Sequence, residues 1–322
     1  GLAAALAMIE AKDAVHGPLE LLFTVDEEVG LTGAGKLKPG FVKGGMLLNL
    51  DSEELGAVYI GCAGGGDTTL KLPLDFVDAP AGTKGFVLRV SGLRGGHSGI
   101  DIHEQRGNAI KVLARCLWKA ARTQPVHLAS VRGGSKRNAI PRDGEAELMV
   151  LETAVDDLSG IIGEEAANIG AELGGREANM SVKIVPAERP SGRVMDAESQ
   201  RKLLNLLAAL PHGVHTMCYD IPGLVETSNN LATVATGGDE GVIGLSTRSS
   251  ISSALKALRD EIRAAAELAG AAIEENEPYP GWKPNLDSKL LAIVKSVHVR
   301  EFGNEPALKA IRGTVRLWNF WP

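Results

Sequence analysis

Residues 19–28 read LELLFTVDEE, an apolar run of strand length that ends in three adjacent carboxylates. Residues 46–50, MLLNL, repeat the pattern, and Asp51 follows them directly. Residues 2–15, rich in Ala and Leu, are expected to form a buried helix. Continuous apolar strands separated by helical segments are typical of a parallel sheet that is covered on both faces. We therefore predict an α/β fold with a mostly parallel sheet for this part of the chain.

The sequence pattern changes after Gly82. Residues 86–90 alternate as in an antiparallel strand, and the glycine-rich segment 92–99 follows. Helices are then expected around 110–117 and over 154–173 and 250–270, with strands at 146–151, 231–234 and 242–246. This spacing predicts an α+β layer, one sheet with helices on one face. We predict that this unit, residues 84–273, is inserted into a domain made of residues 1–83 and 274–322. The last helix of that domain is expected over about 286–301.

Composition limits the classes of protein to consider. The 322 residues are 44% hydrophobic and 23% charged, as in a globular protein of one large or two medium domains. The net charge of −6 argues against nucleic acid as a partner, and no apolar run reaches the roughly 20 residues that span a membrane. Cys62, Cys116 and Cys218 lie far apart without a CxxC pair, which favours a reducing, cytoplasmic compartment.

The two acidic clusters are the sharpest chemical signal. Asp26, Glu27 and Glu28 repel one another, which is costly unless cations neutralise them. Because successive side chains of an extended segment point in opposite directions, one glutamate can face a metal while its neighbour faces a substrate. Asp51, at the next strand end, adds a hard oxygen ligand. The sequence therefore favours a divalent metal pair at one edge of the sheet, and the alternative is a solvated acidic turn.

A histidine flanked by glycines is the second signal. Gly95-Gly96-His97-Ser98-Gly99 permits unusual backbone angles and close approach to a ligand. His97 could polarise a carbonyl group or bind a metal, and the alternative is a histidine of a surface loop. Ser98 as the nucleophile of a serine hydrolase is a weaker hypothesis, because Ile100 breaks the G-x-S-x-G pattern at its last position.

Two further polar residues are candidates for substrate binding. Asn138, in the segment 137–141, places an amide donor before a rigid turn, where it either braces the turn or contacts a substrate. Arg248 ends a predicted strand, and a guanidinium there can bind a carboxylate through two hydrogen bonds. A surface ion pair is the alternative role for Arg248.

Seven segments together resemble the M20 metallopeptidase family, most closely its Xaa-His dipeptidase branch. The segments are TVDEEVG at 24–30, NLDSEE at 49–54, GCAGG at 61–65, GGHSG at 95–99, RNAIP at 137–141, GLVETS at 223–228 and YPGW at 279–282. Their order and spacing match from about residue 1 to about residue 311. The resemblance implies a zinc-binding catalytic domain, an inserted lid or dimerisation domain, and a homodimer formed through that lid.

The resemblance also implies a reaction, the hydrolysis of dipeptides of the Xaa-His type, such as β-alanyl-histidine. Two Zn²⁺ ions, which Mn²⁺ or Co²⁺ could replace, would activate the attacking water. Glu27 would be the general base, Glu28 a ligand of one metal and Asp51 a ligand of the other.

The remaining roles implied by the resemblance belong to the inserted domain. His97 would stabilise the tetrahedral intermediate, commonly across a dimer interface. Asn138 and Arg248 would bind the substrate, Arg248 at its free carboxylate.

The chain also departs from the family pattern. That pattern places a metal-binding His and a bridging Asp before Gly1, and a further metal-binding His beyond Ala310. Residues 312–322, RGTVRLWNFWP, look foreign to it. We therefore expect a fragment that holds little zinc and has little activity. The alternative is a non-catalytic, lid-dimerised protein of the M20 type, and a metal assay on the chain and on the full-length gene product separates the two.

Overall fold

The computed structural model describes residues 1–26, 32–51 and 54–311 and divides into two compact units. The smaller unit is Gly1–Gly64 with Tyr279–Pro322, and the larger unit, Gly65–Pro278, is inserted between them. The predicted combination of an α/β fold with an inserted α+β unit is confirmed. The predicted boundaries near 83 and 274 lie inside the larger unit, because β2 pairs there with β14.

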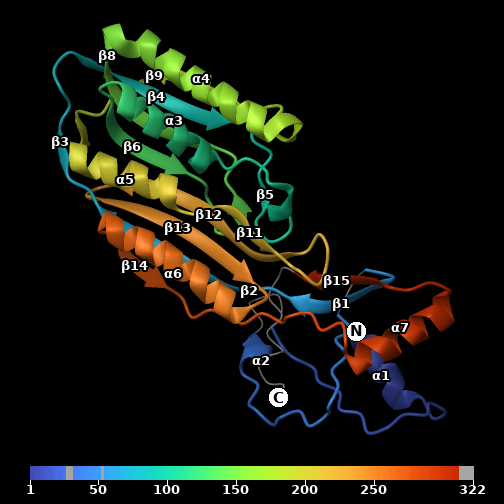
Figure 1. The fold of residues 1–322 in the computed structure, drawn as a ribbon. Helices are drawn as coiled ribbons and strands as arrows, with labels where there is room; N and C mark the ends of the chain where they lie inside the picture. The colour runs from blue at the N-terminus through green and yellow to red at the C-terminus, as the bar shows by residue number, and fades with distance from the viewer. Residues whose placement is uncertain (27–31, 52–53, 312–322) are drawn as a thin grey trace. The chain divides into compact units, whose positions relative to one another are not determined.

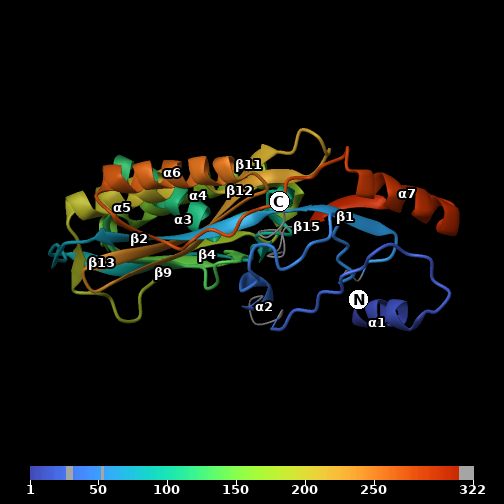
Figure 2. The same cartoon turned by 90° about the horizontal axis from the view of Figure 1, so that it is seen from below.

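One nine-stranded sheet forms the larger unit. Figure 2 shows helices α3, α4, α5 and α6 together on one face of this sheet, as the sequence predicted. The strand order is β14 (Ala272–Glu275), β2 (Gly64–Pro73), β13 (Glu240–Ser249), β12 (Val225–Gly237), β6 (His127–Gly133), β8 (Gly144–Leu151), β4 (Thr83–Ser91) and β9 (Ser181–Pro186), with β11 (Gly213–Met217) beside β12. Short pairs join β3 (Phe76–Asp78) to β10 (Arg193–Met195) and β5 (Gly96–His97) to β7 (Ala139–Ile140).

The helices of the larger unit are α3 (Ala109–Thr123), α4 (Val155–Leu173), α5 (Ala197–Ala209) and α6 (Ser252–Ala269). The predicted stripe of α3 is buried against the sheet, with Ile110, Leu113 and Leu117 all at most 2% exposed. Asn108 caps this helix, because its Oδ1 accepts hydrogen bonds from the N–H groups of Ile110 and Lys111 at 2.9 and 3.2 Å.

Lys111 of α3 closes the C-terminal end of α5. Its Nζ donates to the carbonyl oxygens of Leu207, Ala208 and Leu210 at 3.1, 2.8 and 2.9 Å. Carbonyl groups at a helix end have no partner within the helix, and a cation there also complements the helix dipole.

We predict that Lys111→Met lowers the free energy of unfolding by about 1–3 kcal/mol, the usual cost of leaving half-buried polar groups without partners. Urea denaturation measures it. Lys119→Met in the same helix is the matched control, since Lys119 forms ion pairs with Glu164 and Glu165 at 3.3 and 3.5 Å. Its loss should change stability by less than about 1 kcal/mol. Equal effects of the two substitutions would refute the capping role.

The smaller unit contains α1 (Leu2–Glu10), α2 (Thr32–Gly35), β1 (Ala57–Cys62), α7 (Lys289–Phe302) and β15 (Ala307–Ile311). Strands β1 and β15 are parallel, with Ala57 opposite Ala307. Cys62 and Trp282 exchange backbone hydrogen bonds of 2.9 and 2.7 Å. A Cβ on Gly64 would lie 2.3 Å from the nitrogen of Gly281. Two of the seven segments in the sequence pattern therefore meet through close backbone contact that requires glycine.

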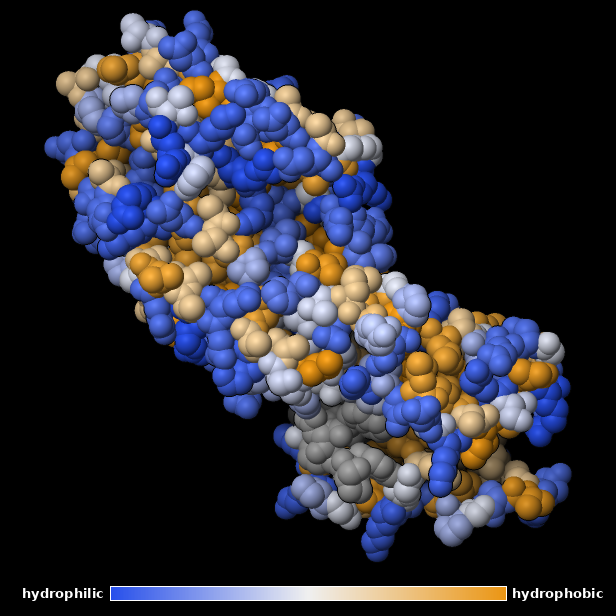
Figure 3. Space-filling view, in the orientation of Figure 1, coloured by the Kyte–Doolittle hydropathy of each residue, from blue (hydrophilic) through white to orange (hydrophobic). Residues whose placement is uncertain are grey.

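Three predictions for the first 50 residues are wrong. The helix expected over 2–15 ends at Glu10 and has no buried residue, and the segments 19–25 and 46–50 are not strands. Val25 and Met46 are 67% and 62% exposed. An apolar run becomes a strand only where a partner strand accepts its hydrogen bonds, and none lies beside these segments within the described residues. In Figure 3 the smaller unit accordingly shows apolar patches at its surface.

No helix of the described part of the chain is long and apolar enough to cross a membrane.

Candidate functional site

Three of the predicted site residues lie together in the larger unit. His97 lies in β5 opposite Ala139 of β7, and Asn138 directly precedes that strand. Arg248 lies in β13 opposite Ser228 of β12, and its charge acts on the imidazole of His97. Figure 1 shows β5 near the end of the sheet where β11 and β12 lie. The structure thus brings a histidine, an amide and a guanidinium from separate elements to one place.

The His97 ring is held in one tautomer. The N–H of Gly99 donates to Nδ1 at 3.1 Å, so Nδ1 is the acceptor and the neutral ring carries its proton on Nε2. Burial lowers the pKa of His97 below its ordinary value, the charge of Arg248 lowers it further, and the charge of Asp101 opposes them. At neutral pH the ring is therefore an uncharged donor through Nε2–H.

The backbone around Asn138 is fixed from two sides. Buried Asn230 of β12 donates through Nδ2 to the carbonyl oxygens of Arg137 and Ala139 at 3.0 and 2.8 Å. The N–H of Ser98 donates to the carbonyl oxygen of Asn138 at 2.8 Å. The Asn138 side chain is exposed. Its amide is therefore presented to solvent or to a ligand by a loop that is tied to the His97 segment.

Two buried oxygen atoms beside this group have no hydrogen-bond partner within the described residues, Oγ of Ser98 and Oδ1 of Asn230. Both residues are nearly inaccessible, 2% and 1% exposed. Buried polar atoms are nearly always paired with protein, water or a ligand. Ser98, next to His97, and Asn230, which holds the Asn138 segment, thus offer acceptor positions beyond those that the fold uses.

Asp51 directly follows the segment 46–50. It is exposed, and its N–H donates to Oδ1 of Asn49 at 2.9 Å. Among the residues that the structure describes, no group of three His, Cys, Asp or Glu side chains could hold a metal ion. Glu27 and Glu28 lie outside the described residues. The described residues alone therefore do not fit the predicted zinc pair.

The residue before the acidic pair has an unusual backbone. Asp26 has φ 57°, in the left-handed region that a residue other than glycine rarely adopts. The N–H of Gly33 donates to the carbonyl oxygen of Val25 at 3.0 Å. The chain therefore turns sharply as it enters the acidic cluster, and aspartate is among the residues that tolerate this conformation best.

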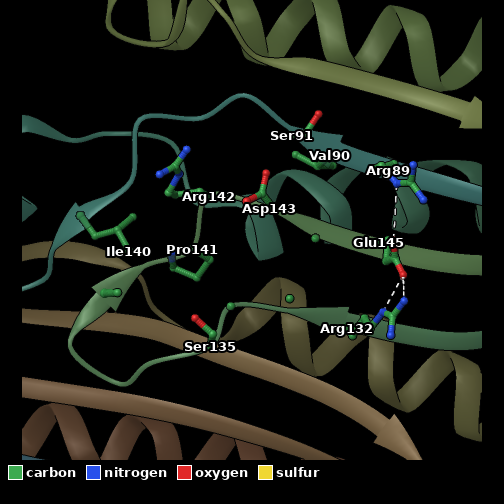
Figure 4. Close-up of a pocket in the computed structure, with 14 residues that line it drawn as sticks. Arg89, Val90, Ser91, Arg132, Ser135, Ile140, Pro141, Arg142, Asp143 and Glu145 are labelled. Atoms are coloured by element: carbon green, nitrogen blue, oxygen red, sulfur yellow. Dashed lines mark hydrogen bonds and ion pairs between the residues drawn. The ribbon is translucent and has the colours of Figure 1, made fainter.

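A cavity of about 510 Å³ lies on the strands β4, β6 and β8 (Figure 4). Within it, Glu145 bridges Arg89, at 3.5 Å, and Arg132, whose Nε donates to Oε1 at 2.5 Å. These charges partly offset one another, and the residues lining the cavity include none of the predicted site residues. The cavity includes Ala139 and Ile140 of strand β7.

Three residues that hold the His97 and Asn138 segments were not predicted from the sequence: Asn230, Asp101 and Arg106. Asn230 had no sequence signal, because it acts by pairing with backbone far away in the chain. Asp101 could have been noticed, since a carboxylate four residues after a candidate histidine can reach back to its backbone.

Comparisons with known proteins place the chain. Residues 88–177 match the peptidase dimerisation domain family. The chain is 36% identical over 311 residues to the cytosol non-specific dipeptidase of Escherichia coli (strain K12), covering 97% of this chain and 64% of that protein. It superposes on the crystal structure of an aminoacylhistidine dipeptidase from Vibrio alginolyticus with a TM-score of 0.95 and 36% identity, covering 99% of this chain and 65% of that one. The chain thus spans just under two thirds of the length of these relatives.

Proposed function

We propose that the chain belongs to the M20 peptidase family, which its matches to the peptidase dimerisation domain and to two dipeptidases support, and that its full-length gene product is a dipeptidase. The observation that carries the proposal is the arrangement of His97 and Arg248. The Nε2–H donor of neutral His97 and the guanidinium of Arg248 lie near one another. Such a pair suits a substrate that has a scissile carbonyl for the histidine and a free carboxylate for the arginine. A dipeptide has these two groups close together.

The proposed reaction assigns a task to each residue of this chain. Arg248 binds the terminal carboxylate, and Asn138 orients the peptide through its amide. The Nε2–H of His97 donates to the carbonyl oxygen as negative charge develops on it. Glu27 takes a proton from the attacking water and passes it to the leaving amine. Dipeptides of the Xaa-His type, such as β-alanyl-histidine, are the proposed substrates.

We also propose that the reaction depends on a divalent metal, with zinc as the first candidate and Glu28 and Asp51 among its ligands. Family membership supports this. A bound metal would supply an activated water. A homodimer through the larger unit is proposed because that unit contains the peptidase dimerisation domain, and a cytoplasmic location because the E. coli relative is named a cytosol enzyme.

The test is hydrolysis by the full-length gene product, measured as release of free amino acid from a panel of dipeptides. The panel includes β-alanyl-histidine, its C-terminal amide, and a tripeptide. We expect the dipeptide to be cleaved and the amide to react at least tenfold more slowly, because Arg248 loses its charged partner. Equal cleavage of acid and amide would contradict the role of Arg248. No cleavage of any dipeptide by folded protein would contradict the function.

A dimer in which His97 serves the site of the partner subunit makes a distinct prediction. His97→Ala and Glu27→Ala variants should each be nearly inactive, and a mixture that exchanges subunits should regain activity. With random exchange about half of the dimers are mixed, and each carries one intact site of two, so activity should approach about a quarter of wild type. No recovery despite proven exchange would place His97 in the site of its own chain.

A further inference from the structure

The backbone of His97 is held from both sides by one short segment. Its N–H donates to Oδ2 of Asp101 at 2.7 Å. Its carbonyl oxygen accepts from the N–H groups of Ile100 and Asp101 at 3.0 and 2.8 Å. Together with the bond from Gly99 to Nδ1, these contacts fix residues 97–101 as one tight turn. The orientation of the imidazole therefore depends on the position of the Asp101 carboxylate.

Arg106 in turn holds Asp101. Its Nη2 lies 3.2 Å from Oδ1 of Asp101, its Nη1 donates to the carbonyl oxygen of Gly95 at 2.6 Å, and its Nε donates to Oε2 of Glu104 at 2.8 Å. The Arg106 and Asp101 side chains are only 13% and 21% exposed. A guanidinium that is bound in three directions and shielded from water has little freedom to move.

Local backbone geometry makes room for this arrangement. Gln105 has φ 52° after the short helix Ile102–Glu104, which reverses the chain and brings Arg106 back to the glycine-rich loop. Gly96 has φ 142°, and a Cβ there would lie 2.3 Å from Nη1 of Arg106 and 2.5 Å from Oδ2 of Asp101. Glycine at 96 is thus required both by its backbone angle and by the side chains packed against it.

We propose that Arg106 and Asp101 are positioning residues for the reaction, which hold His97 as a fixed Nε2–H donor. This proposal rests on the proposed function for its link to catalysis. A shift of about 1 Å in a positioned group can cost about a hundredfold in rate. The pair acts through the His97 turn and has no direct part in bond making or breaking.

The pair also sets the charge around the ring. Arg248 and Asp101 are the charged groups whose fields act on His97, with opposite signs. Arg106 offsets the charge of Asp101. Removing Arg106 should therefore raise the pKa of His97, and removing the Asp101 charge should lower it. The tautomer of the ring reports its positioning, whereas the pKa reports the nearby charges.

The experiment combines NMR with kinetics. Imidazole ¹⁵N shifts of the 322-residue chain report the tautomer and pKa of His97 in wild type, Arg106→Met and Asp101→Asn. We expect a single Nε2–H tautomer in wild type, and both tautomers with the opposite pKa shifts in the two variants. Arg94→Met is the matched control, because Arg94 belongs to the same loop and its guanidinium forms a longer ion pair with Glu104, at 3.7 Å. This substitution should leave the tautomer and the pKa of His97 unchanged.

In the full-length enzyme, Arg106→Met should lower kcat by about 10- to 100-fold with KM within about twofold. Arg106→Lys keeps the charge but lacks the planar guanidinium that reaches three partners at once, and it serves if the methionine variant does not fold. An unchanged His97 tautomer and pKa in a folded Arg106 variant and in Asp101→Asn would overturn the proposal. If wild type cleaves no dipeptide, the proposed function fails, whereas the NMR measurement still decides whether the pair positions His97.

Discussion

His97→Ala should lower kcat of the full-length enzyme by about 10²- to 10³-fold, the usual cost of removing one donor to a developing oxyanion. The ring is presented as a neutral Nε2–H donor because Gly99 occupies Nδ1 and because burial and Arg248 disfavour the imidazolium. The larger unit should stay folded, because three of the four hydrogen bonds that hold the turn around residue 97 come from its backbone and Asp101 and do not involve the ring. Steady-state kinetics and a urea titration together measure this.

His103→Ala is the matched control for that substitution. His103 lies in the same loop, and its Nδ1 contacts the carbonyl oxygen of Ile100 at 2.9 Å, but it is exposed and is not assigned a role in the reaction. Its substitution should change kcat by less than about twofold. A His97→Ala enzyme with wild-type kcat would show that His97 is not the hydrogen-bond donor to the carbonyl oxygen in the reaction.

Glu27→Ala, as a separate variant, should lower kcat by about 10²- to 10⁴-fold, the usual contribution of general-base catalysis. Its metal content should remain close to that of the full-length wild type, because the base is not a ligand. Glu28→Ala is the matched neighbour and should lower metal content instead. Elemental analysis beside kinetics separates the two carboxylates. If Glu27→Ala empties the site and Glu28→Ala does not, the two assignments are reversed.

The larger unit was predictable because periodicity and burial agree in it. Apolar spacing in α3 at Ile110, Leu113 and Leu117 matches the buried face of the helix, and the predicted strands at 146–151 and 242–246 lie within β8 and β13. The resemblance to M20 peptidases, predicted from seven short segments, is confirmed by the comparisons.

The smaller unit was harder to predict, because its strands depend on partners rather than on composition. Residues 19–25 are as apolar as β1 but lack a paired neighbour within the described residues, whereas Ala57–Cys62 pairs with Ala307–Ile311 from the far end of the chain. A local pattern carries no information on such a partner.

The candidate site likewise contains residues that the sequence could predict and residues that it could not. His97 was recognisable from its glycines, but Arg106 and Asn230 act by hydrogen bonds to backbone that only the folded chain brings near. Their side chains have no periodic or compositional signal. The roles of Glu27, Glu28, Asp51, Asn138 and Arg248 remain predictions that the substitutions above test.

Free histidine released from β-alanyl-histidine by the full-length gene product is the most direct measure of the central claim, that this chain belongs to a dipeptidase. We predict steady release by the wild-type protein. Glu27→Ala, with its fold intact, should lose at least about 99% of that rate, because removing a general base costs roughly a hundredfold or more. Folded wild-type protein that releases no histidine from this or from any other dipeptide, with divalent metal supplied, would contradict the claim.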